Sequence, residues 1–138
     1  MPWVFDASIA AAWCFEDEQA PETDLLFDRL AFDPATVPSL FPLEIANVLT
    51  QALRRKTPRI TPEKRAEFLY SLSKRAFTID RSTNEHAWSD ILYLADLYLL
   101  STYDAAYLEL AIRHQLELAT LDHDLRSAAK KAGITVIP

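Results

Sequence analysis

Four acidic residues, far apart in the chain, stand where carboxylates can act together in catalysis or metal binding. Asp6 and Asp122 each follow a short apolar run typical of a buried strand. Glu44 and Asp104 each lie at the start of a stretch in which apolar residues recur with helical spacing. Carboxylates held close together raise one another's pKa values, so such a cluster favours binding of a cation.

The ligand type indicates which cation. Carboxylates without cysteine or paired histidine are hard oxygen ligands, which suit Mg²⁺ or Mn²⁺. The single cysteine, Cys14, excludes a Cys-ligated zinc site and an internal disulfide, and the three histidines show no ligand spacing. Mg²⁺ and Mn²⁺ sites serve phosphate chemistry, in which the metal neutralises phosphate charge and stabilises the leaving oxygen.

Each acid also has a structural explanation when it is taken alone. Asp6 fits a turn or a helix N-cap, Asp104 a cap and Asp122 a turn, and the helix dipole favours Glu44 in a first turn. The four together, each with apolar neighbours, favour a common site. We therefore expect them to meet at one rim of a sheet.

The elements that must position these acids are short apolar strands alternating with helices. This pattern predicts a three-layer α/β/α fold with a central, mostly parallel sheet, and one domain over residues 1–138. Parallel strands end at the same edge of a sheet, where ligands tend to bind. We expect strands near residues 3–5, 36–37, 77–79, 118–121 and 134–137, and helices near residues 9–15, 21–30, 43–55, 84–99, 102–114 and 124–132. A further helix is expected to begin at Pro62.

Polar residues at the helix ends predict caps. Ser8 is expected to cap the first helix, Asp124 the last helix at its start, and Gly133 the same helix at its end. His123 is interpreted as a solvated turn residue. The tyrosines near the C-terminal acids are interpreted as core or dimer packing, although stacking on bases is an alternative.

Composition excludes several classes of protein. The chain of 138 residues has one glycine, which excludes a Gly-rich phosphate loop and with it P-loop NTPases and dinucleotide-binding enzymes. The N-terminal residues lack the pattern of an export signal, and the longest apolar stretch is about half the ~20 residues that span a bilayer. We expect a cytoplasmic protein that does not enter a membrane.

The net charge of −6 conceals a basic segment, residues 54–81, which holds nine basic residues against three acidic ones. One interpretation is that this segment guides a polyanion such as RNA toward the acidic rim. The other is that these side chains are only the solvated faces of helices.

Four stretches of the chain resemble PIN-domain nucleases, and among these most closely the VapC-type toxins of prokaryotic toxin–antitoxin pairs. They are V-F-D-A-S (Val4–Ser8), P-L-E-I-A-N-V-L (Pro42–Leu49), S-T-Y-D-A-A-Y-L-E-L-A (Ser101–Ala111) and L-A-T-L-D-H-D-L (Leu118–Leu125). The resemblance runs through essentially the whole chain in order. It implies a Mg²⁺- or Mn²⁺-dependent endoribonuclease with an RNA substrate, 5′-phosphate products, a cognate antitoxin as partner, and a homodimer.

The resemblance also implies roles for individual residues. Asp6 and Asp104 match the principal metal ligands, and Glu44 and Asp122 match ligands that bind through water or hold a second ion. The supporting residues that match are Ser8, Asn47 and Thr120.

For two of the supporting residues, spacing alone also indicates a place beside the acids, apart from the resemblance. Asn47 follows Glu44 by three residues on one helix face, and Thr120 shares a strand side with Asp122. Ser8 is equally well explained as a cap. Asp124 is a possible fifth ligand, although we favour its interpretation as a cap.

Two alternatives remain open from the sequence. In haloacid-dehalogenase-like phosphatases, an aspartate in the position of Asp6 is the nucleophile and a second aspartate two residues later is the acid. Here Ser8 stands in that second position. The other alternative is a PIN-like module that binds RNA or a partner without cutting it.

Overall fold

The sheet has five short strands, all parallel. The computed structural model describes residues 2–138, and its strands lie in the order β3-β2-β1-β4-β5. Trp3, Val4 and Phe5 of the central strand are completely buried, as expected of a strand covered on both faces. The strands are β1 (Trp3–Phe5), β2 (Ala35–Val37), β3 (Phe77–Ile79), β4 (Glu117–Ala119) and β5 (Val136–Ile137).

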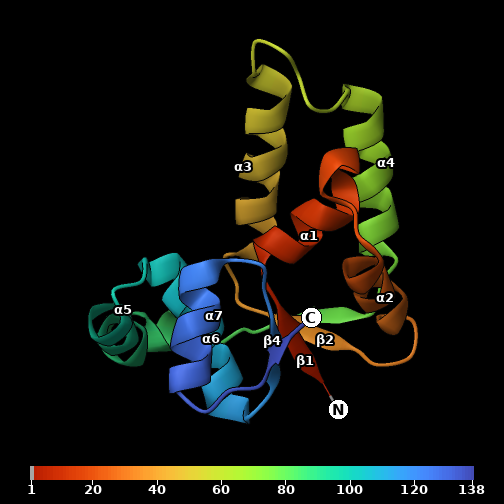
Figure 1. Ribbon diagram of the computed structural model, residues 1–138. Coiled ribbons are helices and arrows are strands. Elements are labelled where there is room, and N and C mark those ends of the chain that lie inside the picture. Colours follow the sequence, from red (N-terminus) through yellow and green to blue (C-terminus); the bar gives the residue numbers. More distant parts are fainter. Residues whose placement is uncertain (1) are drawn as a thin grey trace.

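Helices cover both faces of this sheet, which confirms the predicted three-layer α/β/α fold. Figure 1 shows α6 and α7 on one side of the sheet, and α1 and α2 on the other. Within residues 2–138, no helix is long and apolar enough to cross a membrane. The helices are α1 (Ala7–Cys14), α2 (Pro21–Arg29), α3 (Phe41–Arg54), α4 (Pro62–Ser73), α5 (Leu92–Tyr98), α6 (Thr102–His114) and α7 (His123–Lys131), with short turns η1 (Glu16–Glu18), η2 (Thr83–His86) and η3 (Ala87–Ile91).

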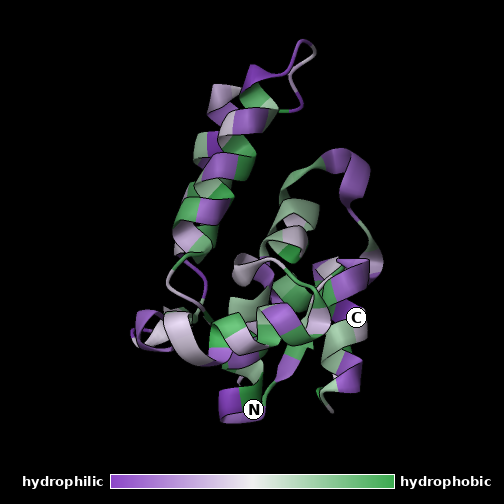
Figure 2. Ribbon diagram, turned by 90° about the vertical axis from the view of Figure 1, so that its left-hand side faces the viewer, coloured by the Kyte–Doolittle hydropathy of each residue, from purple (hydrophilic) through white to green (hydrophobic). Residues whose placement is uncertain are grey.

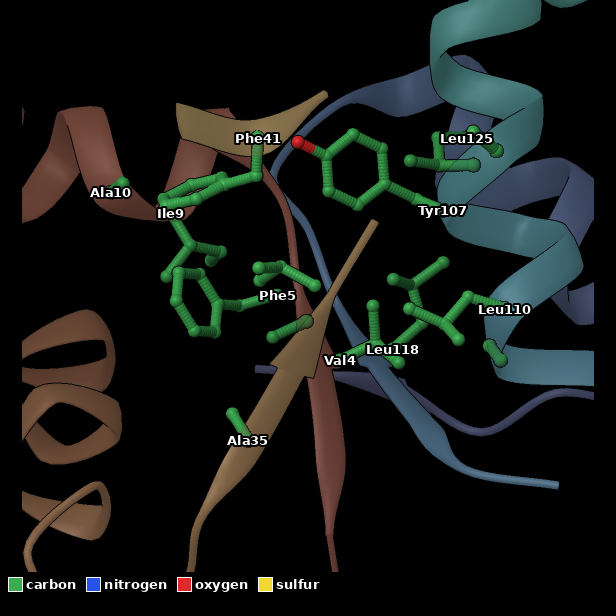
Figure 3. Close-up of a cluster of buried hydrophobic side chains, with 14 of the residues drawn as sticks. Val4, Phe5, Ile9, Ala10, Ala35, Phe41, Tyr107, Leu110, Leu118 and Leu125 are labelled. Carbon is green, nitrogen blue, oxygen red and sulfur yellow. The ribbon is translucent and has the colours of Figure 1, made fainter. Parts of the chain in front are cut away.

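The core lies between the sheet and these helices, and Figure 3 shows part of it. The ring of Phe5 packs against Trp13 at 5.0 Å and Phe41 at 5.2 Å between centroids, which joins β1 to α1 and α3. Helix α6 is buried continuously from Ala105 to Ala111, as its apolar sequence predicts. Its position against the sheet fixes the residues of its first turn.

The predicted helix over residues 84–99 is wrong in detail. The chain there forms the 3₁₀ turn η2 and the π-helical turn η3 before α5 begins. A π turn holds an extra residue, so apolar side chains on either side of it no longer share one face. Trp88 is consequently 92% exposed.

Helices α3 and α4 form an arm that extends away from the sheet (Figure 1). The buried side of α3 consists of Phe41, Ile45, Leu49 and Ala52, so Leu43 faces outward, although it fits the apolar spacing expected from the sequence. Figure 2 shows the loop at the tip of the arm as largely hydrophilic. The basic segment begins there.

Candidate active site

The site begins at the carboxyl edge of the two central strands. Strands β1 and β4 are parallel neighbours in which Phe5 pairs with Ala119. The next residues, Asp6 and Thr120, therefore leave the sheet side by side, and the Asp6 amide donates to the Ala119 carbonyl at 3.2 Å. Parallel register thus joins residues that lie 114 positions apart in the sequence.

Asp6 is buried, with 4% of its surface exposed, and protein groups orient its carboxylate. Its Oδ1 atom accepts hydrogen bonds from Ser8 Oγ at 2.6 Å, Ser8 N at 3.0 Å and Ile9 N at 3.2 Å. Its Oδ2 atom accepts one, from Thr120 Oγ1 at 2.5 Å. The N-cap of α1 is therefore Asp6, and the expectation that Ser8 caps this helix is wrong, because the Asp6 carboxylate reaches the first amides.

Asp122 lies beside this pair at the start of α7. Its amide donates to Thr120 Oγ1 at 3.1 Å, and its Oδ2 atom accepts from the Leu125 amide at 2.9 Å. Asp122 is thus the N-cap of α7, and the expectation that Asp124 caps it is wrong. Asp124 falls in the first helical turn and is exposed.

Glu44 is held by a residue that the sequence reasoning missed. Tyr107, buried on α6, donates its hydroxyl to Glu44 Oε1 at 2.6 Å. In Figure 3 the ring of Tyr107 reaches from α6 toward Phe41 at the start of α3. Tyr107 follows Asp104 by three residues on the same helix face, a spacing that places it beside the site but does not identify Glu44 as its partner. Within residues 2–138, Asn47 forms no side-chain hydrogen bond to Glu44.

Asp104 lies within electrostatic reach of the other three acids. Burial, followed by repulsion from Asp122, Glu44 and Asp124, raises the pKa of Asp104 to about 6. Burial also raises the pKa of Asp6 to about 6, against the hydrogen bonds that lower it, and Asp104 adds to the rise. The structure therefore brings Asp6, Glu44, Asp104 and Asp122 together, and we call this group the acidic rim.

The acidic rim has no ion-pair partner in the part of the chain that the structure describes. Within residues 2–138, none of its four carboxylates forms a salt bridge. Asp6 Oδ2 accepts a single hydrogen bond and so keeps a lone pair for another ligand. An uncompensated group of hard oxygen ligands is what a divalent cation such as Mg²⁺ requires.

A different group has the tightest spacing of possible ligand atoms. Among residues 2–138, only His86, Asp90 and Glu109 bring three such atoms within 4.8 Å of one another. Both oxygens of Glu109 already accept from Arg113, each at 2.9 Å, so a positive charge is present there. Within residues 2–138, the acidic rim has no three ligand atoms as close together as these.

The basic segment is separated from the acidic rim. Arg54 follows Glu44 by ten residues of α3, about 15 Å along the helix axis. Arg59 pairs with Asp17 at 2.7 Å and Glu18 at 2.6 Å. Part of the segment therefore joins the loop at the tip of the arm to η1.

Comparison with known proteins gives one family and several solved structures. The PIN domain family matches residues 3–131. No curated protein matches the chain. The structure is similar to PAE2754 from Pyrobaculum aerophilum, with a TM-score of 0.68 and 22% identity over 99% of this chain and 90% of that one.

Two further solved structures contain toxin–antitoxin proteins. VapBC2 from Rickettsia felis, bound to a DNA fragment from its promoter, gives a TM-score of 0.66 and 11% identity over 99% of this chain and 97% of that one. A toxin–antitoxin complex from Klebsiella pneumoniae gives 0.57 and 19% identity over 87% of this chain and 86% of that one. At these identities the likeness establishes the shared fold.

Proposed function

The chain belongs to the PIN domain family, and from this premise we propose that it is a divalent-metal-dependent endoribonuclease, the toxin of a toxin–antitoxin pair. PIN domains are generally nucleases. The observation that carries the proposal is the acidic rim, in which four carboxylates share one edge of the sheet without a protein cation. The phosphatase alternative loses support, because the residue in its acid position, Ser8, donates to Asp6 and orients it.

The donor set fits Mg²⁺ or Mn²⁺. We assign Asp6 and Asp104 as the principal ligands, with Glu44 and Asp122 binding through water or holding a second ion. When bound, the metal neutralises charge on the scissile phosphate and stabilises the departing 3′ oxygen.

Ser8 and Thr120 support the site by fixing the orientation of Asp6. Asn47, exposed one helical turn after Glu44, is proposed to contact the substrate.

The chain's own groups position the attacking water and take its proton. Glu44 Oε1 is occupied by the Tyr107 hydroxyl, whereas its Oε2 accepts no hydrogen bond within residues 2–138. Burial and the nearby carboxylates raise the pKa of the Tyr107 phenol, so Tyr107 remains a hydrogen-bond donor and keeps Glu44 in place. Oε2 can accept the proton as the water oxygen attacks phosphorus and the bond to the 3′ oxygen breaks.

The test is cleavage of structured RNAs by the purified chain with Mg²⁺ or Mn²⁺. We expect cleavage with 5′-phosphate ends that stops in EDTA and falls at least about 10³-fold in Asp6→Asn. Asp28→Asn, the same charge change at an exposed position of α2, is the matched control and should cleave normally. Cleavage that survives both EDTA and Asp6→Asn would contradict the mechanism. RNA binding that ignores divalent ions, without cleavage, would favour the non-catalytic module.

We propose that the cognate antitoxin inhibits the enzyme by placing an Arg or Lys side chain at the acidic rim. The uncompensated carboxylates provide the complementary charge for that side chain. Candidates are small proteins with a basic tail encoded in the neighbouring reading frame. Glu44→Gln should weaken inhibition at equal antitoxin concentration, and unchanged inhibition would exclude the contact.

We propose that a second copy of the chain covers an apolar patch beside the rim. The patch consists of Leu43, Trp88, Leu92 and Tyr103, whose exposed fractions are 78%, 92%, 42% and 64%. Exposed apolar groups gathered in this way are typical of an interaction surface. Light scattering should show a homodimer that dissociates in Trp88→Arg. A monomeric wild-type protein at micromolar concentration would contradict this assignment.

A further inference from the structure

A hollow of about 390 Å³ lies between the end of α5 and the outer face of α7, next to the acidic rim. One wall consists of Leu97, Tyr98 and Leu99, and the other carries His123, Asp124, Ser127 and Lys131. We call it the α7 groove. Asp124 connects it to the rim, because its charge contributes to the raised pKa of Asp104.

The α7 wall is a row of unpaired polar groups. His123, Ser127 and Lys131 recur every four residues, which places them on one helix face over about 12 Å. Within residues 2–138, none of these three side chains forms a hydrogen bond or ion pair. Each can donate a hydrogen bond, and Lys131 adds a full positive charge.

The α5 wall is apolar and is shaped by an unusual backbone. Leu99 adopts the left-handed conformation, with φ at 56°, and is 89% exposed. This conformation is costly for a residue with a Cβ atom, and glycine would adopt it freely. The leucine therefore gives the groove an apolar surface in a position where folding alone favours glycine.

We propose that the α7 groove binds a nucleotide of the RNA strand next to the scissile phosphate. The base packs against Leu97, Tyr98 and Leu99, and Ser127 and Lys131 bind the backbone phosphate. Asp124 repels a phosphate at the end near the rim, so the phosphate lies toward Lys131. This inference rests on the proposed ribonuclease function and assigns the substrate subsite of the same site.

The test measures binding of a fluorescein-labelled single-stranded RNA by anisotropy, with EDTA present and Asp6→Asn in every protein so that the RNA stays intact. Lys131→Ala should weaken binding about fivefold and reduce the slope of log K against log salt concentration by about 0.7. The matched control is Lys130→Ala, the adjacent exposed lysine in the same last helical turn but outside the groove. Its effect should stay below about twofold.

Leu99→Gly separates binding from stability. It should weaken RNA binding about fivefold, because an apolar contact with the base is lost, and raise the melting temperature by about 3 °C, because the backbone strain is relieved. The control is Gln115→Gly, since Gln115 is also left-handed, with φ at 54°, and ends α6 outside the groove. It should raise the melting temperature and leave RNA binding unchanged.

The groove assignment would be overturned by equal effects of Lys130→Ala and Lys131→Ala. Unchanged RNA affinity in Leu99→Gly would overturn it as well. A wild-type chain that binds no RNA would have the same consequence. If the groove binds a protein partner instead, both groove variants will bind RNA normally, which also overturns it. Failure of the ribonuclease proposal is a separate result. In that case wild-type protein cleaves no RNA with Mg²⁺ or Mn²⁺, while groove variants still change RNA affinity.

Discussion

Two groups of buried or half-buried acids in this molecule have opposite chemistry. In the acidic rim, burial and mutual repulsion raise the pKa values of Asp6 and Asp104 to about 6. In the second group, Asp80 and Glu109 share one guanidinium. Arg113 Nη2 lies 2.7 Å from Asp80 Oδ2 and 2.9 Å from Glu109 Oε1. Burial opposes ionisation of Asp80 too, but hydrogen bonds from Arg113, Thr83 and Ser82 hold its pKa well below the usual range.

The difference between the pKa values of the two groups comes from the presence of the Arg113 guanidinium and not from the acids themselves. The Asp80–Glu109–Arg113 group carries its own positive charge and joins the loop after β3 to α6, so it contributes to stability. Within residues 2–138, the rim has no such charge, so its repulsion is relieved by protonation or by a cation from outside the chain. The grouped acids of the rim are therefore the candidates for function, whereas Asp80 and Glu109 are structural.

The largest expected effect comes from removing the cation of the structural group. Arg113→Met leaves the half-buried Asp80 and the buried Glu109 without the guanidinium and should lower the free energy of unfolding by about 4 kcal/mol. Urea denaturation measures this loss, and Arg54→Met, at an exposed position of α3, is the control. A loss below about 1 kcal/mol would show that Asp80 and Glu109 do not depend on Arg113.

The rim should give the metal-free protein an unusual pH dependence. The native pKa of Asp6, about 6, exceeds its ordinary value of 3.8, so the folded protein holds this proton more tightly. The resulting stabilisation is complete below pH 3.8 and is lost as pH rises through about 6. Measured in EDTA, the free energy of unfolding should therefore fall by about 3 kcal/mol more in wild type than in Asp6→Asn between about pH 4 and pH 7.5. Parallel pH profiles for the two proteins would contradict the raised pKa.

Tyr107→Phe tests the neutral partner of the rim. It removes the hydroxyl that holds Glu44 and preserves the buried ring, so RNA cleavage should fall about tenfold while the fold is retained. Initial cleavage rates measure the effect, with circular dichroism to verify folding. Tyr70→Phe, at an exposed tyrosine of α4, is the control. An unchanged cleavage rate would remove Tyr107 from the site.

The smallest expected effect is a gain in stability. Asp104→Asn relieves the repulsion from Asp122 and Glu44. The free energy of unfolding in EDTA should therefore rise by about 1 kcal/mol. The gain is small because Asp104 is half-exposed and solvent screens its charge. Thermal unfolding above pH 7 measures it. A lower melting temperature than wild type would show that Asp104 is structural.

Much of the fold and the grouping of the acids follows from the sequence. Asp6 and Asp122 come directly after apolar strands, and parallel strands bring such residues to one edge. The helix over residues 102–114 was predicted with its observed bounds, because its apolar residues leave only an interior position. These predictions depend on patterns that extend through whole elements.

Individual contacts could not be predicted in the same way. The caps were assigned to Ser8 and Asp124, because several neighbouring polar residues can cap a helix and backbone geometry selects among them. Tyr107 was assigned to packing, since the sequence does not show which residue of α3 its hydroxyl meets. Leu43 and Trp88 are exposed although both fit the apolar spacing of their predicted helices. Spacing does not show which apolar side chains reach the core, and at Trp88 a π turn changes the helix face.

The pairing of β1 with β4 has a consequence for synthesis of the chain. Asp6 is synthesised 114 residues before Thr120, whose hydroxyl orients it. A nascent chain shorter than this has the first acid but neither its support nor Asp122. The acidic rim therefore cannot be complete until the chain through Asp122 has been synthesised.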